Sequence, residues 1–298
     1  MPKLSTSFEQ INTLQRRYRK ALPGRDFLLH RLFREEIAEV VYHSHCLQGG
    51  EISYKKIEQI LQDRDSQRSF LKSEIAEIEN LERSLLLMQE DEAKAELNRE
   101  KMTSLHEILM LNLDQKTLGR FRKNKERARV KTDVEDYSGP SPTKMHDLLE
   151  DALVDYYSSH HEGITKRLAR FHLAFANARP FTDGNGRVAR NAVNYLLMRD
   201  GFPTIIFRKW DQRKYNEAFK EFNEKSLTKK MEEIISSALI DSLHKRLAYL
   251  DNKKIVTLAD YARSKKLSPS ALLNKAKRQT IEAFLEQDVW KIGVVQKK

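Results

Sequence analysis

R-P-F-T-D-G-N-G-R-V-A-R, residues 179–190, is the stretch from which the fold and the site of this chain can be worked out. Gly184 and Gly186 flank Asn185, so the backbone can turn sharply there and present several N–H groups at the start of a helix. Such a turn is a ready anion-binding site. Asp183 precedes it and offers the kind of oxygen ligand that Mg²⁺ prefers.

Two arginines complete this stretch. Arg187 and Arg190 are three residues apart, so on a helix they share one face. Each guanidinium forks onto a pair of oxygen atoms, which suits a di- or triphosphate. The turn, the carboxylate and the two arginines together predict a site for a nucleoside triphosphate.

The rest of the chain favours a mainly α fold. Of its 298 residues, 40% are apolar, which supports a substantial core. No proline occurs between Pro23 and Pro140, and apolar residues recur there at helical spacing. Strand candidates are few: residues 205–207, the region around 130–134, and a short hairpin formed by residues 281–284 and 289–292.

Composition excludes several classes of protein. No run of eighteen apolar residues exists, and the first ten residues lack the apolar stretch of a secretory signal. The single cysteine, Cys46, rules out an intrachain disulfide and fits a reducing compartment, so we expect a cytoplasmic protein without a membrane partner. The net charge is +11. We interpret basic residues 116–131 as a solvated face.

The stretch 179–190 resembles the signature of one family, the Fic (Fic/Doc) proteins, H-P-F-x-D/E-G-N-G-R-x-x-R. Every defining position matches except the first, where Arg179 replaces His. The resemblance covers about half of the chain, roughly residues 100–245. It implies a Fic/Fido-type helical bundle with a short β-hairpin flap.

The resemblance also implies ATP and Mg²⁺ as cofactors and a role for each matching residue. Fic enzymes transfer AMP from ATP to a Ser, Thr or Tyr hydroxyl of a target protein. Asp183 would hold the metal, Gly184, Asn185 and Gly186 would cradle the α- and β-phosphates, and Arg187 and Arg190 would reach the β- and γ-phosphates.

Arg179 stands at the position of the catalytic base. In the family the His there takes the proton of the target hydroxyl, and a permanently charged guanidinium cannot do so. We assign structural roles to His160, His161 and His172. The sequence therefore predicts an impaired adenylyltransferase. A non-enzymatic ATP-binding pseudoenzyme, transfer of phosphate or phosphocholine, and an introduced rather than natural Arg179 stay open.

Two further segments resemble parts of Fic proteins. Tyr137, Gly139 and Pro140 fit the flap that pairs with an extended stretch of the target; an exposed turn is the alternative. Residues 44–53 resemble the inhibitory segment S/T-x-x-x-E-G/N, with Ser44, Gln48 and Gly49 at its defining positions. Since Gln48 replaces the Glu, its contact with Arg190 would lose the charge. An interhelical loop is the alternative.

The C-terminal segment is predicted to be a small helix-turn-helix or winged-helix-like module. Residues 251–298 hold eleven Lys/Arg against five Asp/Glu. A basic second helix suggests DNA binding through Asn274, Lys275, Lys277 and Arg278. The alternative is a packing or protein-contact module. The expected domains are a helical region 1–99, a Fic core 100–250 and this module, 251–298.

Overall fold

The computed structural model describes residues 4–62, 70–90, 95–123, 126–128 and 139–295. Within these residues the protein is mainly α, as the sequence predicts. The described part divides into two compact units. Unit 1 consists of residues 1–36, 201–205 and 235–298, and unit 2 of residues 37–200 and 206–234. Among the described helices, none is long and apolar enough to span a bilayer.

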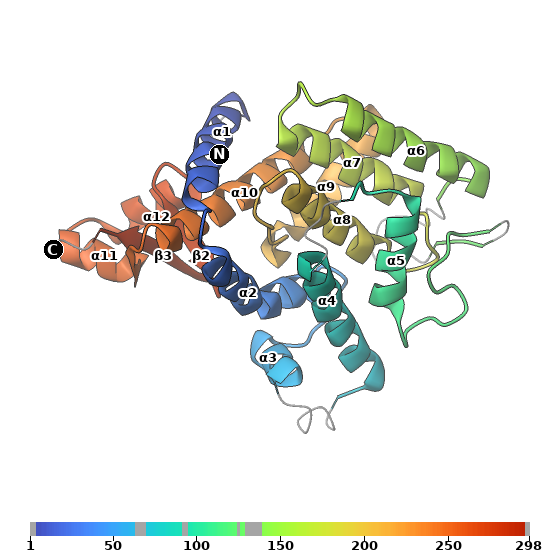
Figure 1. Cartoon of the computed structure of the whole chain (residues 1–298), viewed down its shortest axis with the longest axis horizontal. Helices are drawn as coiled ribbons and strands as arrows, with labels where there is room; N and C mark the ends of the chain where they lie inside the picture. Colours follow the sequence, from blue (N-terminus) through green and yellow to red (C-terminus); the bar gives the residue numbers. More distant parts are fainter. Residues whose placement is uncertain (1–3, 63–69, 91–94, 124–125, 129–138, 296–298) are drawn as a thin grey trace. The chain divides into compact units, whose positions relative to one another are not determined.

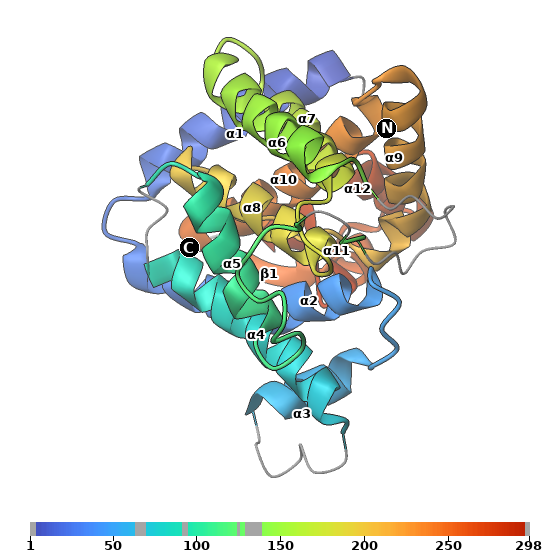
Figure 2. The same ribbon diagram turned by 90° about the vertical axis from the view of Figure 1, so that its right-hand side faces the viewer.

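Unit 2 holds the stretch 179–190. Its helices are the end of α2 (Asp26–Cys46), α3 (Tyr54–Gln62), α4 (Lys72–Glu90), α5 (Arg99–Met110), α6 (Pro142–Ser158), α7 (Ile164–Ala178), α8 (Asn185–Arg199), a short 3₁₀ helix η2 (Lys209–Asp211), α9 (Gln212–Lys225) and the start of α10 (Lys229–Leu250). Figures 1 and 2 show α6 lying along α7, which in turn packs against α8.

Local sequence determines where the helices of unit 2 begin, and burial shows which helix lies in the core. The side chains of Asn98 and Ser141 accept backbone N–H bonds at the starts of α5 and α6, the usual capping device. Residues 187–197 of α8 are all buried. A helix that is buried on every side lies in the core, so the residues of α8 that carry the motif are held by packing from α4, α5 and α7.

Unit 1 contains α1 (Leu4–Ala21), the start of α2, most of α10 and the C-terminal segment. This segment runs through β1 (Lys254–Thr257), α11 (Leu258–Lys265), α12 (Pro269–Lys277), β2 (Ala283–Glu286) and β3 (Val289–Val294). The three strands form an antiparallel sheet in the order β1-β3-β2, with Thr257 opposite Lys291 and Ala283 opposite Ile292. The predicted hairpin at 281–284 and 289–292 is therefore confirmed, with slightly shifted bounds.

The C-terminal segment shares its unit with α1 and α10. Gln279 donates a hydrogen bond to the carbonyl of Ser237, and Arg17 of α1 binds Glu282. The compact units thus do not follow the predicted boundaries at 99/100 and 250/251. The three-domain division stays a prediction, since a compact unit need not coincide with a folding domain.

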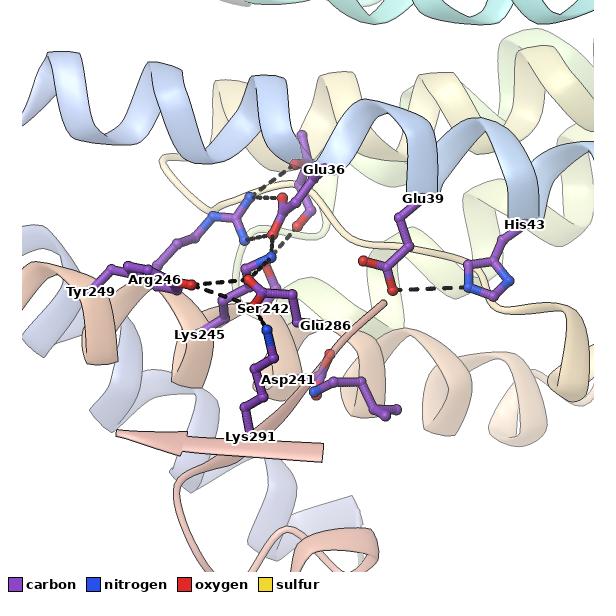
Figure 3. A network of polar contacts seen from close by, with 12 residues as sticks. Glu36, Glu39, His43, Asp241, Ser242, Lys245, Arg246, Tyr249, Glu286 and Lys291 are labelled. Atoms are coloured by element: carbon purple, nitrogen blue, oxygen red, sulfur yellow. Dashed lines mark hydrogen bonds and ion pairs between the residues drawn. The ribbon is translucent and has the colours of Figure 1, made fainter. Parts of the chain in front are cut away.

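A buried ion network lies inside unit 1 and ties α2, α10 and the β-hairpin together. Figure 3 shows Lys245 and Arg246 of α10 pointing toward Glu36 of α2. Arg246 donates to both carboxylate oxygens of Glu36, at 3.1 and 2.6 Å. Lys245 pairs with Glu36 at 2.9 Å and with Glu286 at 2.8 Å. Each buried charge in this cluster therefore meets an opposite one.

One strand candidate is wrong. Residues 205–207 belong to no strand or helix. Ile205 and Phe207 are nevertheless buried, so the apolar character of this segment reflects burial and not strand pairing. The other candidate, around 130–134, lies outside the described residues.

Candidate functional site: the α7–α8 loop

The stretch 179–190 forms the loop between α7 and α8 and the first turns of α8. Arg179 ends α7 in the left-handed conformation, with φ 44° and ψ 63°, and its N–H donates to the carbonyl of Phe175 at 3.2 Å. Few non-glycine residues adopt positive φ values, so the surrounding structure must hold Arg179 in place. Gly184, with φ 75°, then leads into α8.

Two side chains fix the loop from within. Phe181 is fully buried and stacks on the ring of His106, with centroids 4.0 Å apart. The side chain of Asn185 accepts the N–H of Phe181 at 2.9 Å and donates to its carbonyl at 2.8 Å. The predicted phosphate-binding residue Asn185 therefore clamps the loop with its amide, which leaves only its backbone N–H to face an anion.

The start of α8 has the geometry of an anion site. Its first intrahelical bond runs from the Val188 N–H to the Gly184 carbonyl. A helix leaves its first N–H groups without intrahelical partners, and Gly184 supplies no side-chain cap. A Cβ at Gly184 would lie 2.7 Å from the sulfur of Met110. Glycine is favoured there by its positive φ, and a larger residue would also require the Met110 side chain to move.

Arg187 is buried with unmet hydrogen-bonding capacity. Its Nη2 lies 3.0 Å from the sulfur of Met110 and 4.0 Å from a carboxylate oxygen of Asp183. Its Nε and Nη1 have no hydrogen-bond partner among the described residues. Buried cations are normally paired, so this guanidinium is suited to a ligand that brings acceptor oxygens.

Asp183 is the candidate metal ligand of this site. One carboxylate oxygen accepts the Gly184 N–H at 2.6 Å. A hard oxygen donor beside an anion site matches the chemistry of Mg²⁺, which takes one or two carboxylates together with phosphate and water oxygens. The donor set therefore fits a metal that arrives with a phosphate ligand.

Arg190 lies in the core and is held by neutral groups. Its Nε and Nη2 donate to Ser44 Oγ at 3.2 and 2.9 Å, and Nη2 also donates to the Ser44 carbonyl at 3.2 Å. Burial lowers the pKa of Arg190, while Tyr215 raises it. Among the described carboxylates, none forms an ion pair with this guanidinium. Arg190 is thus a buried cation whose described partners are all neutral.

The candidate inhibitory segment does reach Arg190, through a different residue from the one expected. Ser44 in the last turn of α2 makes the contact. Gln48 instead points its amide at the Ser44 carbonyl, 3.5 Å away. Gly49 follows in a turn with φ 81°. The expectation that Gln48 bonds to Arg190 is therefore wrong, because the helix C-terminus turns before Gln48 can approach.

The flap candidate is described in part. Tyr137 lies outside the described residues. A Cβ at Gly139, whose φ is 80°, would lie 3.3 Å from the Cβ of Arg179. The carbonyl of Pro140 accepts a hydrogen bond from Arg122 Nη2 at 2.9 Å. The described part of the flap candidate therefore lies directly against the first residue of the motif.

Arg122 was missed by reasoning from sequence. It belongs to the basic run that we interpreted as a solvated face, yet it is buried. Its Nε donates to the Arg179 carbonyl at 2.6 Å, and its Nη2 also lies 3.4 Å from the Ala178 carbonyl. Its own N–H donates to Pro180 at 2.8 Å. Arg122 caps the end of α7 and holds Arg179 in its left-handed conformation.

The two histidines near the site, His106 and His172, already have hydrogen-bond partners within the protein. His106 Nδ1 accepts the Gly119 N–H at 3.1 Å, which leaves Nε2–H to donate to the Asp183 carbonyl at 3.2 Å. Burial lowers its pKa to about 4, so it stays neutral. His172 is 2.6 Å from the Tyr215 hydroxyl, and burial lowers its pKa to about 3. Both imidazoles are therefore neutral and hydrogen-bonded to other parts of the chain.

Sequence patterns gave no sign of His106, Met110 or Tyr215. Each lies on a helix with ordinary apolar spacing, and each is brought to the site by packing alone. Of the residues predicted for the phosphate site, the structure brings together Asp183, Gly184, Asn185, Gly186, Arg187 and Arg190.

Comparisons with known proteins agree with this geometry. Residues 96–197 match the model of the Fic/DOC family. A protein adenylyltransferase Fic from Nematostella vectensis is 25% identical over 211 residues, which are 68% of this chain and 47% of that protein. The chain therefore spans about half the length of this curated relative.

Two solved structures share the fold. A Fic domain-containing signaling protein from Bacteroides thetaiotaomicron has a TM-score of 0.71 at 20% identity, over 82% of this chain and 98% of that one. A Fic family protein from Desulfovibrio desulfuricans has a TM-score of 0.61 at 16% identity, over 97% of both chains.

Proposed function

Because the chain belongs to the Fic/DOC family, we propose that it binds Mg-ATP at the α7–α8 loop and is built to transfer AMP to a hydroxyl of a target protein. The observation that carries this proposal is Arg187, a buried guanidinium with two unpartnered nitrogen atoms beside the start of α8. The AMP-transfer reaction is supported by the name of a relative of this chain, protein adenylyltransferase Fic.

The residues of the loop have distinct tasks in this proposal. The N–H groups at the start of α8 and the guanidinium of Arg187 bind phosphate oxygens, and Asp183 holds Mg²⁺. The metal, when bound, neutralises phosphate charge. Asn185 and Phe181 keep the loop in shape. Arg190 reaches a terminal phosphate once its hydrogen bonds with Ser44 are exchanged, so the end of α2 competes with the nucleotide.

Transfer itself requires a proton acceptor. The target oxygen attacks the α-phosphorus, the bond to the bridging oxygen breaks, pyrophosphate leaves, and the hydroxyl proton must pass to a base. Arg179 stays protonated and cannot accept it. General-base catalysis typically contributes on the order of 10²–10⁴-fold in rate, so we infer that the chain binds ATP and transfers AMP slowly or not at all.

The test is to restore the base. The full chain and its Arg179→His variant are incubated with Mg-ATP and a cell lysate, and intact-mass analysis detects adducts on any protein, including the chain itself. We expect AMP adducts with Arg179→His and few without it. Brisk transfer by the unaltered chain would show that the base is elsewhere.

The other outcomes separate the alternatives. Calorimetric binding of ATP without adducts from either chain would favour a pseudoenzyme that uses the nucleotide as a signal. An adduct with the mass of phosphate or phosphocholine would replace AMP as the transferred group. Absence of binding at millimolar ATP would contradict the nucleotide site itself.

A second candidate function concerns unit 1, where the C-terminal segment is suited to bind a polyanion. Residues 261–281 contain six Lys/Arg and no Asp/Glu, and all six are exposed. Binding of heparin to the full chain at low salt, lost at high salt, is the simplest test.

A further inference from the structure

We propose that the polyanion bound by unit 1 is double-stranded DNA, and that α12 enters its major groove. The inference rests on the second candidate function and names its partner. We call the exposed side of this helix the α12 face, formed by Ser270, Ala271, Asn274, Lys275, Lys277 and Arg278.

The first argument is the architecture. α11 and α12 are joined by a three-residue turn in which Lys266 has a φ of 53°. Thr257 and Ser268 cap the two helices with their hydroxyls. The antiparallel hairpin β2–β3 follows α12, and β3 also pairs with β1. This is a helix-turn-helix completed by a hairpin wing, in which the second helix is the element that reads DNA.

The second argument is the way α12 is anchored. Leu272 and Ala276 are buried in a small core with Leu258, Ala262, Ala283 and Ile292. At 100° per residue, the direction opposite these anchors is taken by Asn274 and Arg278. Lys275 and Lys277 lie on the two flanks of that direction. The core therefore fixes α12 from behind and leaves its polar side exposed.

The third argument is charge. Of the six cations in residues 261–281, only Arg263 forms an ion pair among the described residues, with Asp260. Two cations near the sheet of unit 1 are paired instead, Lys253 with Glu282 and Lys291 with Glu286. Free lysines on both flanks of one helix match phosphates on both edges of a groove.

The wing of this module differs from α12. Its two-residue turn, Gln287 and Asp288, has φ values of 50° and 62° and places a carboxylate at the tip. Lys291, on the following strand, is paired with Glu286. The wing thus offers phosphates no unpaired cation, so α12 makes the main contacts.

Groove dimensions favour DNA over RNA. The major groove of B-form DNA admits an α-helix, whereas that of A-form RNA is too narrow. Asn274, at the centre of the α12 face, has the amide that bonds bidentately to adenine. Lys275 and Lys277 contribute phosphate contacts, which carry affinity and little sequence information.

The experiment uses the full chain, because the C-terminal segment shares its unit with α1 and α10. Fluorescence anisotropy measures binding to a duplex of about 20 base pairs, roughly two helical turns, and to the matching single strand and double-stranded RNA. Enrichment from a random duplex pool reports base preference. The variants are Lys275→Ala with Lys277→Ala, and Asn274→Ala. The matched control is Lys55→Ala with Lys56→Ala, an exposed pair on α3 of unit 2.

We expect tightest binding to duplex DNA. The Lys275/Lys277 double variant should reduce the salt slope by about two, roughly one for each lost phosphate contact, while the Lys55/Lys56 control leaves it unchanged. Asn274→Ala should lose the enriched base with little change in slope. Thermal unfolding checks that each variant folds, and since all four lysines are exposed we expect no change in midpoint.

Two results would overturn the inference. The first is equal binding to duplex DNA, single-stranded DNA, RNA and heparin, with the same loss of affinity in the Lys275/Lys277 and Lys55/Lys56 double variants. This result would support polyanion binding but contradict a DNA site on α12. No binding to any polyanion at low salt would contradict the polyanion function too, and α12 would then face a protein.

Discussion

Two buried arginine sites in this protein differ in how fully their guanidinium groups are paired. In unit 1, Arg246 meets both oxygens of Glu36, and the neighbouring Lys245 joins the same carboxylate. In unit 2, Arg187 keeps two nitrogen atoms without partners, and Arg190 is held by a serine and a tyrosine. A buried charge that is paired stabilises one arrangement of helices, whereas a buried charge without its counterpart is suited to a ligand. The following predictions test this difference.

The largest effect is expected from breaking the paired site. Glu36→Gln leaves the Arg246 charge buried without a carboxylate, which typically costs about 3–5 kcal/mol of the free energy of unfolding. The adjacent Glu35 is a matched control, because it pairs with Arg31 at the surface. Glu35→Gln should change stability by less than about 1 kcal/mol. Urea unfolding measures the free energy of unfolding of both variants. Equal losses would show that the buried ion pairs of Glu36 stabilise the protein no more than the surface pair of Glu35.

Removing the charge of Arg187 should affect ligand binding and not stability. Arg187→Met removes a buried charge that lacks a full set of partners, so stability should hold or rise. ATP affinity should fall by roughly 10- to 100-fold, because hydrogen bonds to charged groups contribute about 1.5–3 kcal/mol. Arg199→Met, at the far end of the same helix, is the control for binding measured by calorimetry. A large loss of stability with unchanged ATP affinity would make Arg187 a structural residue.

Acid should weaken the paired site selectively. Arg246 and Lys245 outweigh the effect of burial and lower the pKa of Glu36 from 4.5 to about 2. A depressed carboxyl pKa contributes stability above pH 4.5 that is lost as pH falls toward 2. The free energy of unfolding should therefore drop less between about pH 5 and about pH 3 in Glu36→Gln than in the unaltered chain. Parallel curves for the two proteins would contradict this pKa.

The smallest effect concerns the contact between Ser44 and Arg190. Ser44→Ala removes two of the three hydrogen bonds that the guanidinium makes to Ser44 and keeps the one to the Ser44 carbonyl. Stability should therefore fall by about 1 kcal/mol, and ATP affinity should rise a few-fold, by roughly the same free energy. Ser84→Ala is the control, since this buried hydroxyl bonds to Asn191 one residue further along α8. The control should lose stability without gaining affinity. If Ser44→Ala weakens ATP binding instead, Ser44 positions Arg190 for the nucleotide rather than competing with it.

Local chemistry explains why much of this could be derived from sequence. Helical spacing and the proline-free stretch predicted a mainly α chain. The run from Asp183 to Arg190 predicted a cluster of candidate phosphate-binding residues, since they are close in sequence and one loop and one helix suffice to bring them together. Phosphate binding itself stays a prediction. The hairpin 281–284 and 289–292 was equally local, with two strands joined by a tight turn. Short-range order of this kind is set by turn residues and periodicity.

Only the tertiary structure decided which charges are paired. Arg122 is buried and caps α7, although its sequence neighbourhood is that of a solvated basic run, because the carbonyls it binds come from residues 57 and 18 positions away. Ser44, rather than Gln48, meets Arg190 across 146 positions. Glu36 and Arg246 are 210 positions apart. Burial and pairing arise from packing between distant segments, and periodicity within one segment carries no information about the residue that will face it.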